Sequence, residues 1–247
     1  MSAIPDGCSQ PGACPRPYSV TMTWLSHLRA AKGYELAVRA LGSGWFLFLA
    51  LVSGLTALTH ARGLGTGDSG PAEWTALLAS LCLLLFYLVL WWLMLLRPHP
   101  IGQTDGFLPS FNAFLGSYLP WTIVLFAREE VSVGQKFASA LFLLFGTALM
   151  VVVIFHLGRS FSIVPQARYL VRTGPYAIVR NPLYLAEEVA LLGMLLQFYS
   201  FVTLVLLLAH GALQVRRIFY EERLLRRIFP DYDGYARSTS RLVPYVW

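Results

Sequence analysis

Residues 172–188 read RTGPYAIVRNPLYLAEE, and they join an apolar helix that ends near residue 157 to a second hydrophobic segment that begins with two glutamates. Charged side chains close to the core of a bilayer are costly, so Glu187 and Glu188 indicate a function or a partner that retains them. Turn-forming residues and arginines surround this pair. The stretch therefore predicts a functional site where a loop meets the membrane.

The composition of the chain is typical of an integral membrane protein. Of its 247 residues, 56% are hydrophobic and 13% are charged, whereas a soluble domain has about 25% charged residues. The formal net charge of +6 does not point to nucleic acid, because the arginines flank hydrophobic segments in the manner of cytoplasmic loops. We therefore expect a protein of the membrane, with membrane lipid as a neighbour and no nucleic-acid partner.

The hydrophobic segments predict an all-α fold, a polytopic transmembrane bundle with about six crossings of about 20 apolar residues each. The last segment, 183–219, is too long for one crossing. Polar and aromatic residues at 197–200 interrupt it, so we expect a helical hairpin there. The other expected crossings are 36–59, 74–96, 107–127 and 137–157, the third of them weakened by Asn112 and Pro120.

The positive charges predict the orientation of the chain. With the amino terminus in the cytoplasm, only Arg62, Arg128 and Lys136 of the 19 basic residues fall in outside loops, which leaves 16 inside. Such a bias is a strong orientation signal. Both termini are therefore expected on the cytoplasmic side, where the carboxyl-terminal tail folds as a cap over the loop at residues 159–182.

The same pattern divides the chain into three parts. Residues 1–36 form a polar tail interrupted by prolines, which either lies on the membrane surface as an amphipathic stretch or is disordered. Residues 37–136 hold the amino-terminal transmembrane helices. Residues 137–247 hold the hairpin and the motifs that carry chemistry.

The first motif is a turn followed by the start of a helix. Gly174 before Pro175 marks the turn, and Tyr176 follows it. Asn181 and Pro182 then predict a helix start, because Asn is a favoured N-cap and Pro fits the first helical position. The backbone N–H groups at such a terminus attract an anion.

One face of this helix gathers polar side chains. Asn181, Tyr184 and Glu187 are spaced by three residues, so the same face carries all of them. The face continues from the helix start into the membrane boundary.

The second motif is an acidic pair among arginines at the end of the hairpin, residues 216–225, RRIFYEERLL. Arg217 and Glu221 are four residues apart and form a helical ion pair, which is worth about 0.2–0.5 kcal/mol in isolation. A solvated helix with ion pairs explains this cluster alone. Together with the first motif, Glu221 and Glu222 predict a ligand site.

These motifs resemble the isoprenylcysteine carboxyl methyltransferase family and its phospholipid N-methyltransferase relatives. That family carries a Gly-Pro-Tyr turn, then Arg-His-Pro-x-Tyr-x-Gly, then a Glu-Glu-x-x-Leu box after a helical hairpin. Here Asn181 stands in place of the family's His, Ala186 in place of its Gly, and Arg168 in place of a further His before the turn. The resemblance covers about residues 137–245, through segments 157–162, 174–176, 180–186, 221–225 and 229–244.

The resemblance implies S-adenosylmethionine as the methyl donor, held without a Rossmann domain at the cytoplasmic boundary of the membrane. Acids, N–H donors and aromatic rings suit its ammonium, carboxylate and sulfonium groups, and Tyr176 and Tyr184 are expected beside the sulfonium. Glu221 or Glu222 is expected to hold the ammonium or the ribose hydroxyls. The predicted donor-binding residues are Arg168, Gly174, Pro175, Tyr176, Arg180, Asn181, Pro182, Tyr184, Glu221 and Glu222.

The resemblance also implies a lipophilic methyl acceptor that enters from the bilayer between helices. Arg217, Tyr184 and Glu187 are the predicted catalytic residues, with Arg217 orienting an anionic head group. A carboxylate of the isoprenylcysteine type is the first expectation. A phospholipid or a small hydrophobic amine, thiol or acid fits nearly as well.

A non-catalytic membrane protein or a small transporter is the alternative from another class. Glu187 and Glu188 would then be proton or ion ligands. The polar residues concentrate at one membrane face rather than at the midplane, which argues against a transporter. Neither the cysteines nor the histidines have metal-ligand spacing, so no metal is expected.

Overall fold

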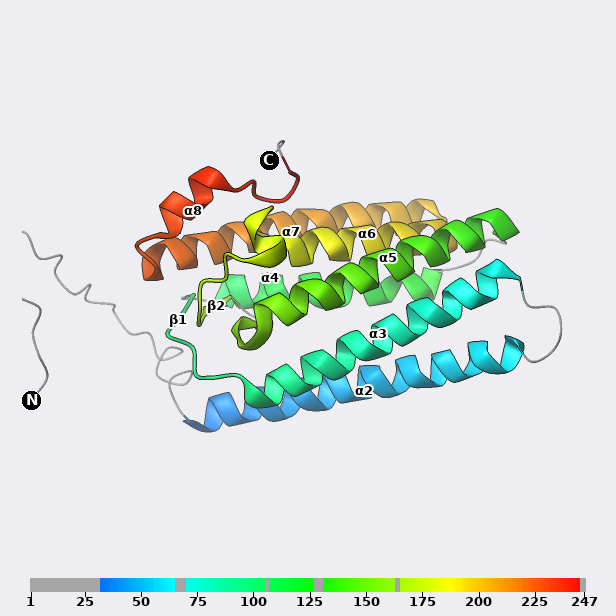
Figure 1. The fold of residues 1–247 in the computed structure, drawn as a ribbon, viewed down its shortest axis with the longest axis horizontal. Helices are drawn as coiled ribbons and strands as arrows, with labels where there is room; N and C mark the ends of the chain where they lie inside the picture. The colour runs from blue at the N-terminus through cyan, green and yellow to red at the C-terminus, as the bar shows by residue number, and fades with distance from the viewer. Residues whose placement is uncertain (1–31, 65–69, 105–106, 127–130, 163–164, 245–247) are drawn as a thin grey trace, which may run out of the picture.

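The computed structural model describes residues 32–64, 70–104, 107–126, 131–162 and 165–244. Long helices run side by side through the molecule, with small elements at one end (Figure 1). Most of the predicted tail 1–36 lies outside the described residues. Its last part is the first turn of helix α2 (Lys32–Leu64), so this helix begins before the predicted boundary.

Four helices are long and apolar enough to cross a membrane, by length and composition. Their outer faces carry exposed apolar side chains such as Leu51, Phe145 and Leu208, which lipid accommodates and water does not. The predicted all-α membrane bundle is therefore confirmed, while the two further crossings, at shorter helices, stay a prediction. The four helices are α2, α3 (Pro71–Leu96), α5 (Val133–Leu157) and α7 (Phe201–Ile228).

The predicted crossing at 107–127 is not one continuous α-helix. It consists of α4 (Phe107–Tyr118) and the 3-10 helix η1 (Leu119–Phe126). Pro120 has no N–H and its ring clashes with the preceding turn, which explains why the α-helix ends there. Asn112, within α4, donates a hydrogen bond of 2.9 Å to the Leu213 carbonyl and so joins α4 to α7.

The helical hairpin forms as the sequence predicts. Helix α6 (Pro182–Gln197) ends at the polar patch, and α7 begins at Phe201. Ser200 caps α7 by accepting a hydrogen bond from the Thr203 N–H, and the Thr203 hydroxyl donates to the Phe198 carbonyl at 2.6 Å. The interruption at 197–200 is therefore a tight turn with its own hydrogen bonds.

Small residues allow α5 and α6 to pack closely. A Cβ atom at Gly146 would lie 2.5 Å from the Ala190 nitrogen, and one at Gly193 would lie 2.8 Å from the Ser139 carbonyl oxygen. The Ser139 hydroxyl donates to the Gly193 carbonyl at 2.8 Å across the same contact. Such close approach is typical of helix pairs in membranes, and it fixes α6 against the bundle.

Replacing Gly193 with valine is expected to destabilise the bundle by roughly 1–3 kcal/mol, because an overpacked contact forces the helices apart. The measurement is the thermal unfolding midpoint of the detergent-purified protein. Gly211→Ala is the matched control, since a Cβ atom at Gly211 has no neighbour within 4 Å. An unchanged midpoint for Gly193→Val would contradict the α5–α6 contact.

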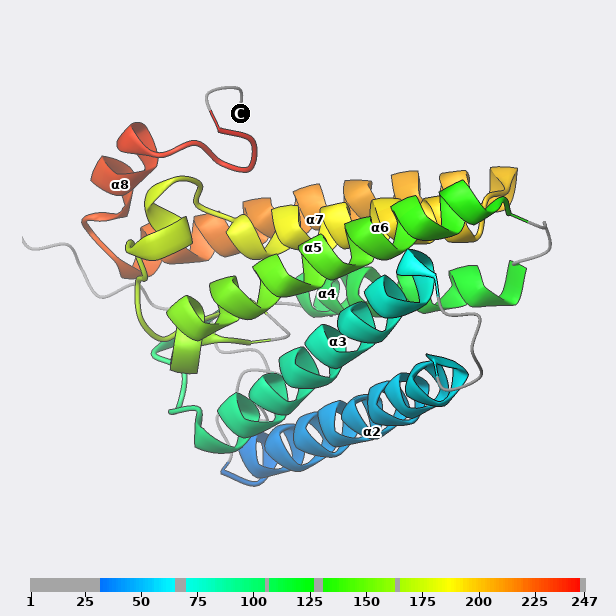
Figure 2. The same cartoon turned by 45° about the vertical axis from the view of Figure 1, so that its right-hand side comes forward.

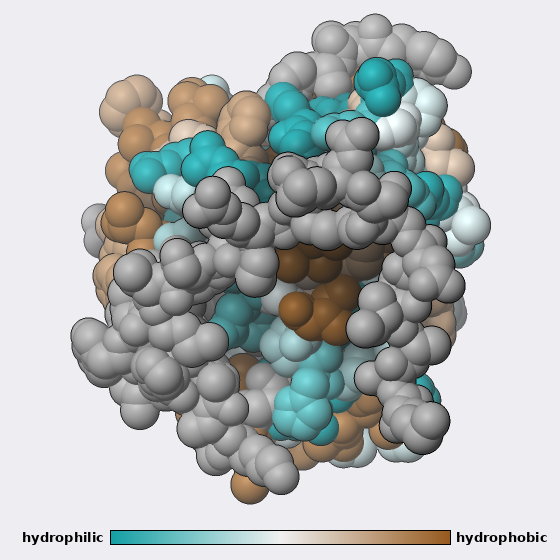
Figure 3. Space-filling model, turned by 90° about the vertical axis from the view of Figure 1, so that its left-hand side faces the viewer, coloured by the Kyte–Doolittle hydropathy of each residue, from teal (hydrophilic) through white to brown (hydrophobic). Residues whose placement is uncertain are grey.

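Short elements gather at one end of the bundle. They include the antiparallel pair β1 (Gly102–Gln103) and β2 (Gln166–Ala167) and the helix α8 (Tyr232–Ser238). Figure 2 shows α8 above the end of α7 and the following chain running back over the bundle, and Figure 3 shows hydrophilic residues gathered at this end. The 3-10 helices η2 (Gly158–Ser160) and η3 (Gly174–Ala177) complete it.

The carboxyl-terminal chain is tied to the loop before α6, as the predicted cap requires. Val179 and Ser240 form a parallel bridge. The Arg180 N–H donates to the Ser240 carbonyl at 2.8 Å, and the Asn181 N–H donates to the Arg241 carbonyl at 3.1 Å. The cap thus holds the start of α6 from outside.

Candidate functional site

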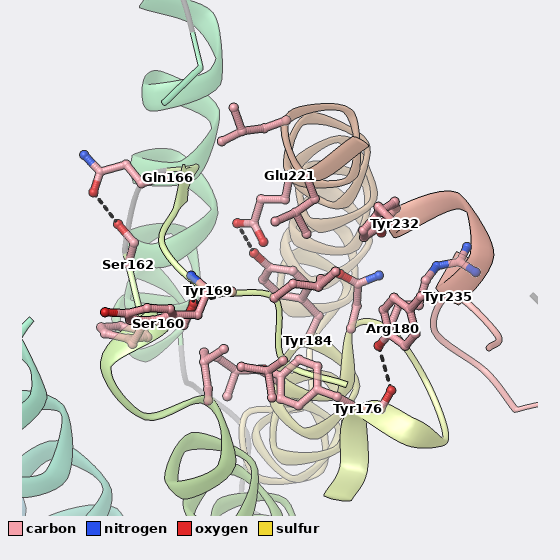
Figure 4. Close-up of a pocket in the computed structure, with 18 of the residues that line it drawn as sticks. Ser160, Ser162, Gln166, Tyr169, Tyr176, Arg180, Tyr184, Glu221, Tyr232 and Tyr235 are labelled. Atoms are coloured by element: carbon pink, nitrogen blue, oxygen red, sulfur yellow. Dashed lines mark hydrogen bonds between the residues drawn. The ribbon is translucent and has the colours of Figure 1, made fainter. Parts of the chain in front are cut away.

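A cavity lies at the loop end of the bundle, between η2, β2, η3, α6, α7 and α8 (Figure 4). We call it the loop-side cavity. It encloses about 830 Å³ of space not filled by atoms, including its open mouth. The residues that give it chemistry are Ser160, Ser162, Gln166, Tyr169, Tyr176, Arg180, Asn181, Tyr184, Arg217, Glu221, Tyr232 and Tyr235.

Tyr184 and Glu221 meet at the floor of this cavity. The Tyr184 hydroxyl donates to Glu221 Oε1 at 2.5 Å, as Figure 4 shows. Arg217 Nε donates to the same oxygen at 3.2 Å, and its guanidinium lies 5.2 Å from the centre of the Tyr184 ring. The helical pair predicted between Arg217 and Glu221 is therefore present, with Tyr184 as its third member.

The second predicted acid, Glu222, has a different environment. Its side chain is 1% exposed and does not line the cavity. Its carboxylate accepts from Arg180 Nε at 3.0 Å and from Arg241 Nε at 3.1 Å, and Arg226 lies 3.4 Å away. Buried charges need such partners, so Glu222 ties the loop, α7 and the cap together.

Arg180 and Asn181 line the cavity, but their polar groups bind the cap. Arg180 Nη1 donates to the Ala236 and Thr239 carbonyls. Asn181 occupies the N-cap position of α6, yet its side chain makes no capping bond. Its amide donates to the Arg241 carbonyl at 3.0 Å instead. The prediction of a side-chain cap at Asn181 is wrong: its Nδ2 donates to the Arg241 carbonyl and to Glu222, and its oxygen accepts no hydrogen bond from the first turn of α6.

Tyrosines form much of the cavity wall. The Tyr235 hydroxyl donates to the Tyr176 carbonyl at 2.6 Å. Burial raises the pKa of Tyr176 and Tyr232 far above the usual range, and it raises the pKa of Tyr235 to about 12. These rings stay neutral near pH 7 and present electron-rich faces to a cation.

Tyr232 and Tyr235 were absent from the predicted site. The signal for them was the Phe-x-x-Tyr-x-x-Tyr pattern of the tail, which places both on α8. Tyr169, also missed, follows β2 in the loop and lines the same cavity. No spacing rule links Tyr169 to the motifs, so only the fold brings it there.

Gly174, Pro175 and Arg168 do not line the cavity. Gly174 has a φ of +61°, and a Cβ atom there would overlap the His156 ring, so this glycine lets the loop pass α5. Arg168 is buried, and its Nε donates to the Pro98 carbonyl at 2.9 Å. The structure therefore places these residues in the scaffold of the loop, while Pro182 begins α6 as predicted.

A second cavity lies deeper in the bundle, and we call it the membrane cavity. It holds about 1380 Å³ of unfilled space, including its opening, and it is lined mainly by apolar and aromatic side chains from α2, α3, η1, α5 and α6. Glu187 and Arg217 are its charged lining residues. The membrane cavity shares Phe161, Leu183, Tyr184 and Arg217 with the loop-side cavity.

Glu187, the remaining predicted catalytic residue, is held from α7. Gln214 Nε2 donates to Glu187 Oε2 at 2.6 Å. The buried ring of His210 lies 3.8 Å from Glu187 and 3.1 Å from Glu188. Sequence spacing did not reveal this pairing, because His210 and Glu187 belong to opposite arms of the hairpin.

The residues of the loop-side cavity suit S-adenosylmethionine. Glu221 supplies a carboxylate for an ammonium or for hydroxyl groups, and the tyrosine faces suit a sulfonium. Leu183 and Tyr184 line the cavity within the first turn of α6, where backbone N–H groups lack helical partners and favour a carboxylate.

Within the residues described, no group of three or more His, Cys, Asp or Glu side chains is placed to hold a metal ion.

Fold and site together define a class: helical membrane proteins with a polar pocket at one end and an apolar cavity beneath it. Residues 135–232 match the sequence model of the phospholipid methyltransferase family. This match confirms the resemblance to the membrane methyltransferases over that segment.

Two curated proteins are similar to part of the chain. One is the nickel-cobalt-cadmium resistance protein NccN of Alcaligenes xylosoxydans xylosoxydans, 40% identical over 77 residues, which are 30% of this chain and 36% of the relative. The other is the cobalt-zinc-cadmium resistance protein CzcN of Cupriavidus metallidurans, 38% identical over 76 residues, 30% of this chain and 35% of the relative. The match thus spans about a third of each relative's length.

Proposed function

We propose that the protein is an integral membrane methyltransferase that uses S-adenosylmethionine and acts on a lipophilic acceptor. The observation that carries this proposal is the wall of Tyr184 and Arg217 between a polar cavity and an apolar one. A polar donor and a lipophilic acceptor would each have a cavity suited to it, with their reacting ends at the shared wall. The match of residues 135–232 to the phospholipid methyltransferase family supports the same reaction.

The donor supplies an electrophilic methyl group when it is bound. In our proposal Glu221 holds its ammonium or ribose hydroxyls, and the first turn of α6 faces its carboxylate. Tyr184 contacts the methyl-bearing region, and Phe161 and Leu183 keep water out of the shared wall. Methyl transfer depends mainly on alignment and desolvation, which the side chains shared by the two cavities would supply.

The acceptor class has two candidates. Arg217 at the wall suits the carboxylate of an isoprenylcysteine-type acceptor, which needs no base. Glu187, the other charged lining residue of the membrane cavity, favours instead an acceptor that loses a proton, such as a lipid amine or a thiol. In both cases the acceptor enters from the bilayer.

We further propose that residues 137–247 form the catalytic region and that both termini lie in the cytoplasm. The loop-side cavity then opens on the cytoplasmic side, where S-adenosylmethionine is available. The basic residues Arg172, Arg180, Arg226 and Arg241 at this end of the bundle support that orientation.

Tyr184→Ala is expected to lower methyl transfer by roughly 100-fold, because it removes both the ring at the shared wall and the hydroxyl bound to Glu221. The assay follows a labelled methyl group from the donor to N-acetyl-S-farnesylcysteine, phosphatidylethanolamine or octanethiol. Tyr199→Ala, at the exposed hairpin turn, is the control. Near-normal turnover in Tyr184→Ala would show that this residue is not part of the site. A wild-type protein that binds no donor and methylates none of the three acceptors would instead favour a non-catalytic membrane protein.

A further inference from the structure

A cluster of polar side chains lies between the two arms of the hairpin, below the shared wall. It consists of Glu187 and Glu188 on α6 and of His210 and Gln214 on α7. The His210 side chain is 0% exposed. Among the described residues neither of its ring nitrogens has a hydrogen bond in good geometry, although both face carboxylates. A buried polar atom without a partner costs about 1–3 kcal/mol, so the two neighbouring carboxylates are what stabilise the buried imidazole.

The two carboxylates flank the imidazole. Nε2 of His210 lies 3.8 Å from Glu187 Oε1, and Nδ1 lies 3.1 Å from Glu188 Oε1. The imidazole therefore stands between an acid that lines the membrane cavity and an acid that does not. This order of groups is suited to passing a proton away from the cavity.

Glu187 is also fixed in direction. Gln214 is buried and donates to its Oε2 at 2.6 Å, which leaves Oε1 toward His210. Asn112 of α4 binds the neighbouring Leu213 carbonyl and steadies this part of α7. The carboxylate thus has a single orientation at the edge of the cavity.

The side chains around Glu187 determine which acceptor head group can bind beside it. Tyr87 of α3, Tyr184 of α6 and Arg217 of α7 face it from the packed elements, together with His210. Arg217 already binds Glu221. A head group at the shared wall would therefore find in Glu187 a carboxylate one helical turn from Tyr184.

From this arrangement, and resting on the proposed function, we infer that Glu187 takes the proton released by the methyl acceptor, that Gln214 positions Glu187, and that His210 and then Glu188 carry the proton onward. The membrane cavity accordingly takes a head group that carries a removable proton. A carboxylate head group would be repelled by the negative charge of Glu187 and has no proton for Glu187 to accept.

The chemistry balances with these groups. The nitrogen or sulfur of the acceptor forms its bond to the methyl carbon, and the carbon–sulfur bond of the sulfonium breaks with its electron pair left on sulfur. The proton of the acceptor goes to Glu187 Oε1, then to His210, whose second nitrogen faces Glu188. One positive charge is lost from sulfur and one proton is gained by the cluster, so the net charge of the site is unchanged.

A binding measurement without donor tests the role of Glu187. Octylamine and octanoate serve as probes, titrated calorimetrically into the detergent-purified protein. We expect wild type to bind octylamine at least 10-fold more tightly than octanoate, and Glu187→Gln to lose this preference. Equal affinities for the two probes in wild type would overturn the assignment of Glu187.

A kinetic measurement tests the role of His210. With octylamine or octanethiol as acceptor, His210→Gln is expected to lower kcat at least 10-fold while KM changes less than 3-fold, because glutamine keeps a donor but carries no titratable proton. The rate of the variant should also lose its dependence on pH between about 5 and 8, the range of ordinary histidine titration. His60→Gln on α2 is the control.

The outcomes separate this inference from the proposed function. Normal kcat and an unchanged pH profile in His210→Gln, or transfer by wild type to carboxylate acceptors alone, would overturn the proton route and leave the methyltransferase intact. A folded wild type that neither binds S-adenosylhomocysteine nor transfers methyl groups to any probe would overturn the proposed function itself.

Discussion

Replacing Glu222 with glutamine is expected to destabilise the folded protein by about 3–5 kcal/mol, because removing one partner leaves buried charges without compensation. Arg180 and Arg241 both direct Nε to this carboxylate, and Arg180 is itself buried beneath the cap. The substitution removes the negative charge that joins the loop before α6, the end of α7 and the carboxyl-terminal chain. The thermal unfolding midpoint in detergent measures the loss.

The control for this prediction is an ion pair at the surface. Asp231→Asn removes the partner of Arg172, but both side chains are exposed, and such pairs contribute about 0–1 kcal/mol. A midpoint for Glu222→Gln within the range of Asp231→Asn would show that the arginine cluster does not hold the cap.

A second large effect, on the affinity for the methyl donor, is expected at Glu221, the acid next to Glu222. Glu221→Gln is expected to weaken donor binding by about 10–100-fold, since hydrogen bonds to a charged group contribute about 1.5–3 kcal/mol and each 1.4 kcal/mol is a factor of ten. Glu221 lines the loop-side cavity and is partly exposed there. The unfolding midpoint should fall less than in Glu222→Gln, because Glu221 pairs with one arginine and Glu222 with three.

Calorimetric titration of S-adenosylhomocysteine measures the affinity of Glu221→Gln. Glu73→Gln, in the exposed first turn of α3, is the matched control for loss of one negative charge. If Glu221→Gln binds as tightly as this control, Glu221 does not contact the donor.

The sequence predicted the fold well because membrane segments carry a strong local signal. Length and apolar composition were sufficient for α2, α3, α5 and α7, and the polar patch at 197–200 located the hairpin turn. The third segment breaks after Tyr118, next to Pro120, which is one of the two residues that weaken its helical pattern.

The site was less predictable because its contacts join distant parts of the chain. Adjacent acids looked equivalent in sequence, yet successive residues of a helix face different directions, so Glu221 points to the cavity and Glu222 to the arginines. The Asn181 side chain donates to a carbonyl 60 residues away and makes no capping bond. His210 has no motif of its own, and only the return of the hairpin places it beside Glu187.

The most direct test of a donor site in the loop-side cavity is titration of S-adenosylhomocysteine into the detergent-purified wild-type protein. Our account predicts saturable binding at one site per chain with a dissociation constant in the micromolar range. It also predicts that binding survives in Asp231→Asn and is weakened in Glu221→Gln. A folded wild type that shows no saturable binding would contradict the assignment of the cavity to a methyl donor.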